Sequence, residues 1–568
     1  MAEGADATRR VTSSSACTSG TTLAKTRRAL PLVSDALAGL TSHRRSHRRR
    51  MALRSEDRVT DNSSERRSES GGRSHVHTRC ETGVAGLDAI LGGGLASNHV
   101  YLVDGDPGTG KTTLGLQFLL RGVALGERGM YFTLSESAAE LRDTATSHDW
   151  SLDGLDVVEL AEVQQTRSDE AYTLFHPSEI ELQQTVEVIL AAIEEKRPVR
   201  IVIDSLSEMR LLARDPLRFR RQILSLKQFF AGRECTALFL DDRSAPDGDM
   251  QLHSLAHGVI VLDHLSVDYG AERRRLEVKK LRGARFRGGY HDFRIRTGGL
   301  DVYPRLEIVA TAGTIEAEEL SSGSSHLDRL LGGGLTVGTS TLITGAAGTG
   351  KSVLSTQYGL AAAGRGERVI FFLFDERAST FRARAQALGM AVEPAEEQGL
   401  VRIQQVEPTQ MSPGEFADTV RRAVEDDGVR MIVIDSINGY MQAMPSERLL
   451  TVQVHELLSY LANQRVSILM TLVQHGVFGA PVDEAAEVSY LADTVLLLRY
   501  FEHAGVVRQA VSVVKKRSGP HEHTIRECRV DRGGLLVGNP LAEFQGVLTG
   551  VPTYIGATAP LMDQRVRP

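Results

Sequence analysis

Two short glycine-rich segments carry the residue types that hold the phosphates of a nucleotide. They read GDPGTGKT (residues 105–112) and GAAGTGKS (residues 345–352), and both satisfy the pattern GxxxxGK[ST]. Their glycines let the backbone wrap closely, so that successive N–H groups and the first turn of a helix face the phosphates. A chance glycine-rich turn is the alternative, but it does not explain two such motifs in register.

Each side chain in these segments has an expected task. Lys111 and Lys351 can reach the β- and γ-phosphates, so we expect them to act in catalysis, while Thr112 and Ser352 can ligate Mg²⁺. The residues expected to bind the nucleotide are Gly105, Gly108, Thr109, Gly110, Lys111, Thr112, Thr113, Gly345, Gly348, Thr349, Gly350, Lys351 and Ser352. The expected cofactors are ATP and Mg²⁺.

Two aspartates end apolar runs farther along the chain. Asp204 lies in VRIVIDS and Asp435 in VRMIVIDS, and a carboxylate at the tip of such a strand suits a second metal contact, usually through water. We therefore assign both residues to the expected metal site. The alternative is an aspartate that only caps the junction between strand and loop.

A third pair of positions differs between the two halves of the chain. The run YFTLSE ends in Ser135-Glu136, whereas FFLFDE ends in Asp375-Glu376. A carboxylate here could polarise the water or hydroxyl that attacks the γ-phosphorus, so Glu136, Asp375 and Glu376 are candidate catalytic residues. The alternative is an acid on a surface loop. The second half has both acids and is therefore better equipped to polarise the attacking water or hydroxyl.

Basic residues follow apolar runs near the end of each half. The runs are VKKLRG, with Lys280 and Arg282, and VVKKRSG, with Lys515 and Arg517. Alternation along a strand places each pair on one face. Such a pair could serve the nucleotide of a neighbouring subunit, as an arginine finger does, which makes these residues catalytic candidates. The alternative is a solvated basic strand.

These motifs need a sheet that brings them together. The apolar runs VYLVD and STLIT precede the two phosphate loops, and each loop opens an amphipathic helical pattern. Short runs rich in β-branched residues alternate with helical patterns such as residues 215–231 and 448–463. This alternation predicts an α/β fold with a mostly parallel sheet flanked by helices.

The motifs recur because the chain contains a repeat. Residues 82–118 and 322–358 align at an offset of 240 with 16 identities in 37 positions, where about 2–3 would match by chance. We expect two domains, residues 79–312 and 313–545. They lie between an Arg- and Ser-rich tail at residues 1–78, expected to be disordered, and an irregular tail at residues 546–568.

Charge and composition exclude several classes of protein. The net charge is −6, but residues 1–78 carry +7 and the remainder −13, which argues against a protein built mainly to coat nucleic acid. No apolar run approaches the roughly 18 residues that cross a bilayer, so we expect no membrane insertion. The four cysteines form no CxxC pair, which fits a reducing cytoplasm. The basic tail leaves contact with nucleic acid or anionic lipid open, and Met51 is an alternative start of translation.

Together these features resemble the KaiC branch of the RecA-like ATPases. The resemblance rests on the doubled GGGL…GxxGTGK[TS] motif, the acid pair after FFLF, the IDS strands and the late K-x-R strands. It implies two tandem RecA-like P-loop NTPase domains in a two-tiered hexameric ring with ATP between subunits. It also implies a catalytic glutamate in the acid pair, and late Lys and Arg residues that act in trans. The first copy is implied to be mainly an ATPase, and the second an ATPase with Ser/Thr autokinase and autophosphatase activity.

Two positions depart from that family pattern. The acid pair of the first copy is Ser135-Glu136, so hydrolysis there depends on Glu136 or is slow. The adjacent Ser-Thr phosphoacceptors of the family's second copy align with Ser489-Tyr490. Ser489 is therefore the candidate acceptor, and an ordered two-site phosphorylation cycle is not expected.

We accordingly expect a signalling or clock-like ATPase that forms a homohexameric ring and has signalling proteins as further partners. A DNA-dependent motor or recombinase is one alternative, because RecA-like folds also serve that role. The acidic repeat and the lack of a basic, aromatic-interleaved loop argue against it. A nucleotide-gated scaffold with little turnover is the other alternative, which Ser135 favours for the first copy.

Overall fold

The computed structural model describes residues 78–160, 177–213, 215–243, 249–266, 270–308, 318–442, 450–474, 489–547 and 553–556. The tail predicted at residues 1–78 lies outside these ranges except for Thr78, and so does most of the tail predicted after residue 545. Both copies of the repeat lie within one compact unit. Among the residues in these ranges, no helix is long and apolar enough to cross a membrane.

The first copy is built on a nine-stranded sheet in which six neighbouring strands run parallel. In spatial order the parallel strands are β5 (Leu155–Glu159), β4 (Gly129–Thr133), β6 (Arg200–Asp204), β7 (Thr236–Asp242), β3 (Val100–Gly105) and β8 (Gly258–Leu265). The sheet continues antiparallel through β9 (Arg273–Leu281), β10 (Tyr290–Arg296) and β11 (Gly299–Tyr303). The first phosphate loop therefore follows a strand inside the parallel part.

The second copy repeats this order strand for strand. Its parallel strands are β16 (Val401–Gln405), β15 (Arg368–Leu373), β17 (Val429–Asp435), β18 (Ser467–Val473), β14 (Ser340–Gly345) and β19 (Thr494–His503), and its antiparallel strands are β20 (Val506–Lys516), β21 (Arg526–Asp531) and β22 (Gly534–Pro540). Three two-stranded pairs complete the set: β1 (Arg79–Cys80) with β2 (Leu95–Ala96), β12 (Glu319–Leu320) with β13 (Leu335–Thr336), and β23 (Phe544–Gln545) with β24 (Thr553–Tyr554).

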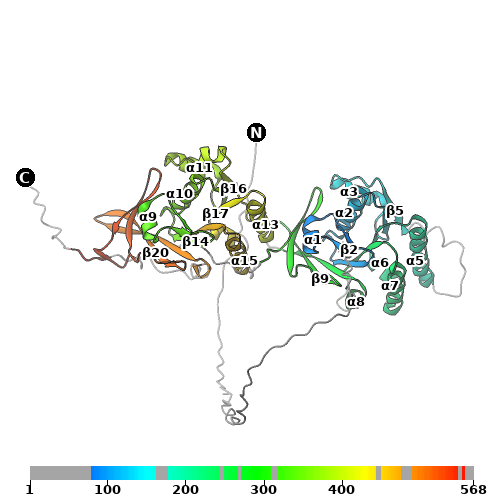
Figure 1. Cartoon of the computed structure of the whole chain (residues 1–568). Helices are drawn as coiled ribbons and strands as arrows, with labels where there is room; N and C mark the ends of the chain where they lie inside the picture. Colours follow the sequence, from blue (N-terminus) through cyan, green and yellow to red (C-terminus); the bar gives the residue numbers. More distant parts are fainter. Residues whose placement is uncertain are drawn as a thin grey trace, which may run out of the picture. The chain divides into compact units, whose positions relative to one another are not determined.

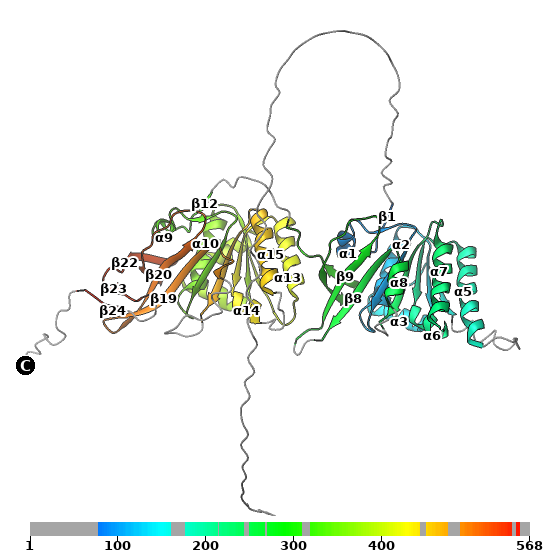
Figure 2. The ribbon, with the colours of Figure 1, turned by 90° about the horizontal axis from the view of Figure 1, so that it is seen from below.

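Helices cover both faces of each sheet and enclose a hydrophobic core on each side (Figures 1 and 2). In the first copy one face carries α1 (Ala85–Ile90), α2 (Lys111–Ala124) and α3 (Ala138–Ser147), and the other carries α5 (Pro177–Lys196), α6 (Leu206–Ala213), α7 (Pro216–Phe230) and α8 (Asp249–Leu255). In the second copy one face carries α9 (Ser325–Leu330), α10 (Lys351–Gly364), α11 (Ala378–Ala387) and α12 (Val392–Glu397). The other face carries α13 (Pro413–Glu425), α14 (Ile437–Gln442) and α15 (Leu450–Asn463).

Helix α7 illustrates how the local sequence specifies these elements. Asp215 caps its start by accepting a hydrogen bond from the Leu217 N–H at 3.1 Å, and a proline occupies the first turn, where no N–H is needed. Phe219, Ile223 and Leu226, spaced three or four residues apart, are buried against the sheet. The helices predicted at residues 215–231 and 448–463 are confirmed as α7 and α15.

The predicted α/β fold with two tandem domains and mostly parallel sheets is confirmed. The antiparallel extension of each sheet was not predicted. Strands such as β9, RRRLEVKKL, alternate polar and apolar residues because one face is less covered, and this pattern does not by itself show which neighbour the strand pairs with.

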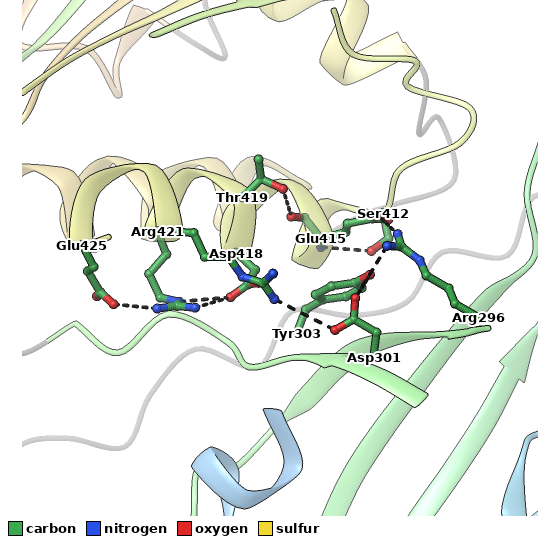
Figure 3. Close-up of polar contacts among 10 residues, drawn as sticks. Arg296, Asp301, Tyr303, Ser412, Glu415, Asp418, Thr419, Arg421 and Glu425 are labelled. Atoms are coloured by element: carbon green, nitrogen blue, oxygen red, sulfur yellow. Dashed lines mark hydrogen bonds and ion pairs between the residues drawn. The ribbon is translucent and has the colours of Figure 1, made fainter. Parts of the chain in front are cut away.

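Strand β10 of the first copy contacts helix α13 of the second through charged side chains (Figure 3). Glu415, whose side chain is 9% exposed, pairs with Arg294 at 3.1 Å and also with Arg296. Asp292 accepts a hydrogen bond from the Gly414 N–H at 2.9 Å. A nearly buried carboxylate thus has two guanidinium partners, which offsets much of the cost of removing its charge from water.

Arg200 is a fully buried charged residue of the first copy. Arg200, at the start of β6, is 1% exposed and stacks on the Phe118 ring at 4.8 Å. Its guanidinium donates to the carbonyls of Glu81 at 2.6 Å and Phe118 at 2.8 Å, and it pairs with Glu127. The second copy has Met431 at the same register position, so this polar cluster is particular to the first.

We predict that Arg200→Ala lowers the free energy of unfolding of the first copy by about 2–4 kcal/mol, because it leaves a carboxylate and two carbonyls without their donor. Trp150 is the only tryptophan and packs against the core of the first copy, so its fluorescence during urea denaturation reports on that copy. Arg430→Ala, at an exposed arginine of β17, is the control and should leave the transition unchanged. Equal stability of both variants would contradict the assignment.

Candidate functional site

The carboxyl ends of four parallel strands meet at one edge of the first sheet. Gly105 of β3 is in register with Asp242 of β7, and Asp204 of β6 is in register with Thr133 of β4. Because β6 also pairs with β7, the four strands form one continuous ladder. The residues that follow these strand ends are therefore brought together although they lie far apart in the sequence.

The first phosphate loop closes around its own lysine. Gly110 has φ +97°, a left-handed conformation that favours glycine, and caps the start of α2. The Lys111 Nζ donates to the carbonyls of Gly105 at 2.8 Å and Asp106 at 2.9 Å. It also pairs with the Asp242 carboxylate at 2.7 Å. The ammonium group therefore lies in the hollow where phosphates are expected.

The second phosphate loop has the same shape but a different neighbour. Gly350 has φ +96°, and the Lys351 Nζ donates to the carbonyls of Gly345 at 2.9 Å and Ala346 at 2.7 Å. At the register position of Asp242 the second sheet has Val473, which offers no carboxylate. Burial lowers the pKa of Lys351 to about 8.

The other loop residues predicted to bind nucleotide lie in the same two turns. Gly108 and Gly348 both have φ +79°, and the buried Thr109 and Thr349 each donate a hydroxyl hydrogen bond of 2.8 Å within their loop. Thr113 is buried in the first turn of α2. The open loops, the enclosed lysines and the helix N-termini together fit a bound triphosphate.

At the predicted metal site of the first copy, Asp204 accepts two hydrogen bonds on one oxygen. Its Oδ2 receives the hydroxyl of Thr112 at 2.9 Å and the phenol of Tyr131, on β4, at 2.5 Å. Burial raises the pKa of Asp204, although both hydrogen bonds oppose that shift. The predicted pair of Thr112 and Asp204 is thus in direct contact.

The predicted metal site of the second copy is arranged differently. Asp435 accepts a hydrogen bond on Oδ1 from Thr471 of β18, and its Oδ2 is buried without a hydrogen-bond partner. Within the part of the chain that the structure describes, no hydrogen bond joins Asp435 to Ser352. A buried carboxylate oxygen without a partner fits a metal-bound water or a cation.

The candidate catalytic acid of the first copy is available for chemistry. Glu136 follows β4, where its backbone N–H and carbonyl bond the hydroxyl of Thr133, and its Oε2 is buried without a hydrogen-bond partner. Burial, together with the nearby carboxylate of Asp204, raises the pKa of Glu136. Both features suit a general base.

The two acids of the second copy have different partners. Asp375 accepts a hydrogen bond from Ser436, next to the tip of β17. Glu376 instead receives the guanidinium of Arg384, on α11, at both carboxylate oxygens. The corresponding position on α3 is Thr144, so the aligned residues Glu136 and Glu376 are in different environments.

Lys280 and Lys515, with the arginines that follow them, contact the segment that precedes the strand paired with their own. Lys280 donates to the Ala256 carbonyl at 2.8 Å and Arg282 to the Ser254 carbonyl at 2.9 Å, both at the end of α8. In the second copy Lys515 donates to the Ala492 carbonyl at 2.6 Å, and Arg517 donates to the Tyr490 carbonyl at 2.8 Å. Each pair therefore contacts a single segment, although Arg282 and Arg517 lie just beyond the ends of β9 and β20.

The candidate phosphoacceptor Ser489 lies at the first described residue after a gap in the structure. Its carbonyl accepts a hydrogen bond from Lys515 at 3.1 Å, and its side chain is partly exposed. One predicted cation and the predicted acceptor are thus neighbours within the second copy.

Several site residues were not predicted from the sequence: Tyr131, Asp242, Arg384, Thr471 and Arg499. Arg499 lies on β19, next to the strand of the second phosphate loop, and its Nε is buried without a hydrogen-bond partner. The doubled acid at the end of ALFLDD was the one available signal for Asp242. The other four lie within strands or a helix, where their types match ordinary core or surface positions.

Comparison with known proteins agrees with this geometry. The family model described as "ATPase: KaiC" matches residues 80–307 and 320–542. The chain is 24% identical to the circadian clock protein KaiC3 of Synechocystis sp., over 84% of this chain and 95% of that protein. It is 26% identical to the circadian clock oscillator protein KaiC of Picosynechococcus sp., over 84% of this chain and 93% of that protein. For KaiC of Synechococcus elongatus the identity is 27%, over 84% and 92%. Because the family model covers most of the sequence in two segments, the chain belongs to the KaiC family of ATPases.

Proposed function

We propose that each copy binds and hydrolyses Mg²⁺-ATP and that the protein acts in signalling or clock-like regulation. The observation that best supports hydrolysis is the same in both copies. A phosphate loop holds its lysine on two loop carbonyls, and the second strand along the sheet from the strand of that loop ends in a buried aspartate. The relatives named as circadian clock proteins support the regulatory role.

The phosphate loops position the substrate, and nearby carboxylates complete the site. When bound, Mg²⁺ would neutralise the negative charge that develops on the phosphates. Thr112 and Asp204 would hold it in the first copy, and Ser352 and Asp435 in the second. Lys111 and Lys351 stabilise the charge on the β- and γ-phosphates.

The general base differs between the copies. In the first, Glu136 accepts the proton of the attacking water at its unpaired Oε2, and its raised pKa suits that task. In the second, Asp375 has this role, because it lies beside the tip of β17, whereas Arg384 occupies both oxygens of Glu376.

The basic residues near the end of each copy, together with Ser489, extend the proposal to an assembly of several subunits. In a homohexameric ring, Lys280 and Arg282 of one subunit would serve the first-copy nucleotide of its neighbour, and Lys515 and Arg517 the second-copy nucleotide. Ser489, next to Lys515, would accept the γ-phosphoryl group in an autokinase reaction. Signalling proteins would be the further partners.

A nucleotide-gated scaffold is a second candidate for the first copy. The ion pair between Lys111 and Asp242 favours it, because phosphates must displace a carboxylate 2.7 Å from the ammonium before they reach it. Ser135, in place of a second acid, points in the same direction. This candidate predicts nucleotide binding with little turnover.

We predict that Lys111→Ala and Lys351→Ala each abolish the turnover of their own copy, lowering it by about 100-fold or more, because a buried cation for the phosphates is lost. Steady-state ATP hydrolysis by the single and double variants measures the two contributions. Lys279→Ala, at an exposed lysine paired with Glu277, is the control. Full activity of the double variant would overturn the proposed enzyme activity. Nucleotide binding without turnover in Lys351→Ala would favour the scaffold for the first copy.

We predict further that γ-labelled ATP transfers label to the Lys111→Ala chain, because its second copy is intact. Ser489→Ala in that background should remove the label, as measured by phosphosite mapping. A chain without label at Ser489 or nearby would reduce the proposal to ATP hydrolysis alone.

The roles of the candidate general bases can be distinguished in the same two variants, Lys351→Ala and Lys111→Ala. With the second copy inactivated by Lys351→Ala, we expect Glu136→Gln to lower turnover by about 10²- to 10⁴-fold. With the first copy inactivated by Lys111→Ala, Asp375→Asn should have a comparable effect, and Glu376→Gln a smaller one because Arg384 holds that side chain. The reverse order in the second copy would reassign the base to Glu376.

A further inference from the structure

The carboxylates at the two metal sites receive their hydroxyl partners from opposite neighbouring strands. Asp204 is bonded by Tyr131 of β4, and the residue beside it on β7 is Leu240. Asp435 is bonded by Thr471 of β18, and Phe371 takes the place of Tyr131 on β15. The two copies have thus exchanged which side of the aspartate is polar.

This difference between the copies changes how the hydroxyl expected to ligate the metal, that of Thr112 or Ser352, is held. In the first copy Thr112 donates its proton to the same oxygen that accepts the Tyr131 phenol. A hydroxyl that donates to a carboxylate keeps its lone pairs for a cation. That carboxylate oxygen is fixed from two directions, so Thr112 and Asp204 have the relative position that Mg²⁺ requires before it arrives.

Tyr131 is suited to act as a permanent donor. Its side chain is fully buried, and a phenol carries its proton at neutral pH, so it donates to Asp204 throughout. The second copy cannot gain this contact by a simple exchange. The tip of the Phe371 ring packs so closely on α10 that it would lie 2.4 Å from a Cβ added at Gly359.

We propose that Tyr131 is a positioning residue that holds Asp204 against Thr112, so that the first site takes up Mg²⁺-nucleotide at a lower Mg²⁺ concentration than the second. In the second site, among the described residues, no hydrogen bond joins Ser352 to Asp435, so the pair must be ordered on binding. The inference rests on the proposed binding of Mg²⁺-ATP at both sites. It concerns affinity for the metal and does not depend on which copy hydrolyses faster.

The test measures nucleotide binding as a function of Mg²⁺. A fluorescent ATP analogue is titrated with MgCl₂ in the full chain carrying Lys351→Ala, in which only the first loop is intact. We expect Tyr131→Phe to raise the half-saturating Mg²⁺ concentration by about three- to tenfold, the range that corresponds to the net contribution of one ordinary intramolecular hydrogen bond. Binding in EDTA should be unchanged. The Lys111→Ala chain, with only the second loop intact, should require more Mg²⁺ than the Lys351→Ala chain.

Tyr101→Phe is the matched control. Tyr101 is a fully buried tyrosine on β3 whose phenol donates to the Ala96 carbonyl at 2.8 Å, away from Asp204. It should leave the Mg²⁺ requirement within twofold of the parent. An unchanged requirement in Tyr131→Phe, or an equal shift in both variants, overturns the inference alone. Absence of nucleotide binding in the parent chain overturns the proposed function of the first copy and the inference with it.

Discussion

The site depends on the parallel ladder that places the ends of β4, β6, β7 and β3 at one edge. Parallel strands in register place Thr133 beside Asp204 and, two residues farther along the strands, Asp242 beside Gly105, although these residues are far apart in the sequence. Helices can pack on both faces of the sheet without changing this strand register. The geometry of the phosphate loop, of the proposed metal site and of the proposed general base therefore depends on the sheet.

Within this constant frame the two copies have diverged at the side chains that surround the functional groups. Lys111 pairs with the carboxylate of Asp242. At the equivalent position the second copy has Val473, and burial lowers the pKa of Lys351 to about 8. Glu136 is unpaired, and Glu376 has a guanidinium partner. These differences are consistent with two nucleotide sites that have separate tasks.

The sequence predicted those parts of the site that are local. The phosphate loops, the strands that precede them and the terminal aspartates are contiguous patterns, so their types and order were recognisable. Contacts across strands were not, because Tyr131 and Phe371 look alike as core residues and only register shows which one reaches an aspartate. Similarly, the alignment of Glu136 with Glu376 did not reveal Arg384, which lies eight residues after Glu376 on α11.

Strand β10 lies in the middle of a series of contacts that runs from the first copy to the second. Arg294 and Arg296 point to Glu415, and Ile295, on the opposite face of the strand, lies so close to Gly110 that an added Cβ would be 2.7 Å away. Phe416, the residue after Glu415, packs on Phe374, which directly precedes Asp375. Close packing leaves little slack in this series of contacts. A continuous series of side-chain contacts therefore connects the first turn of α2 with the acids of the second copy.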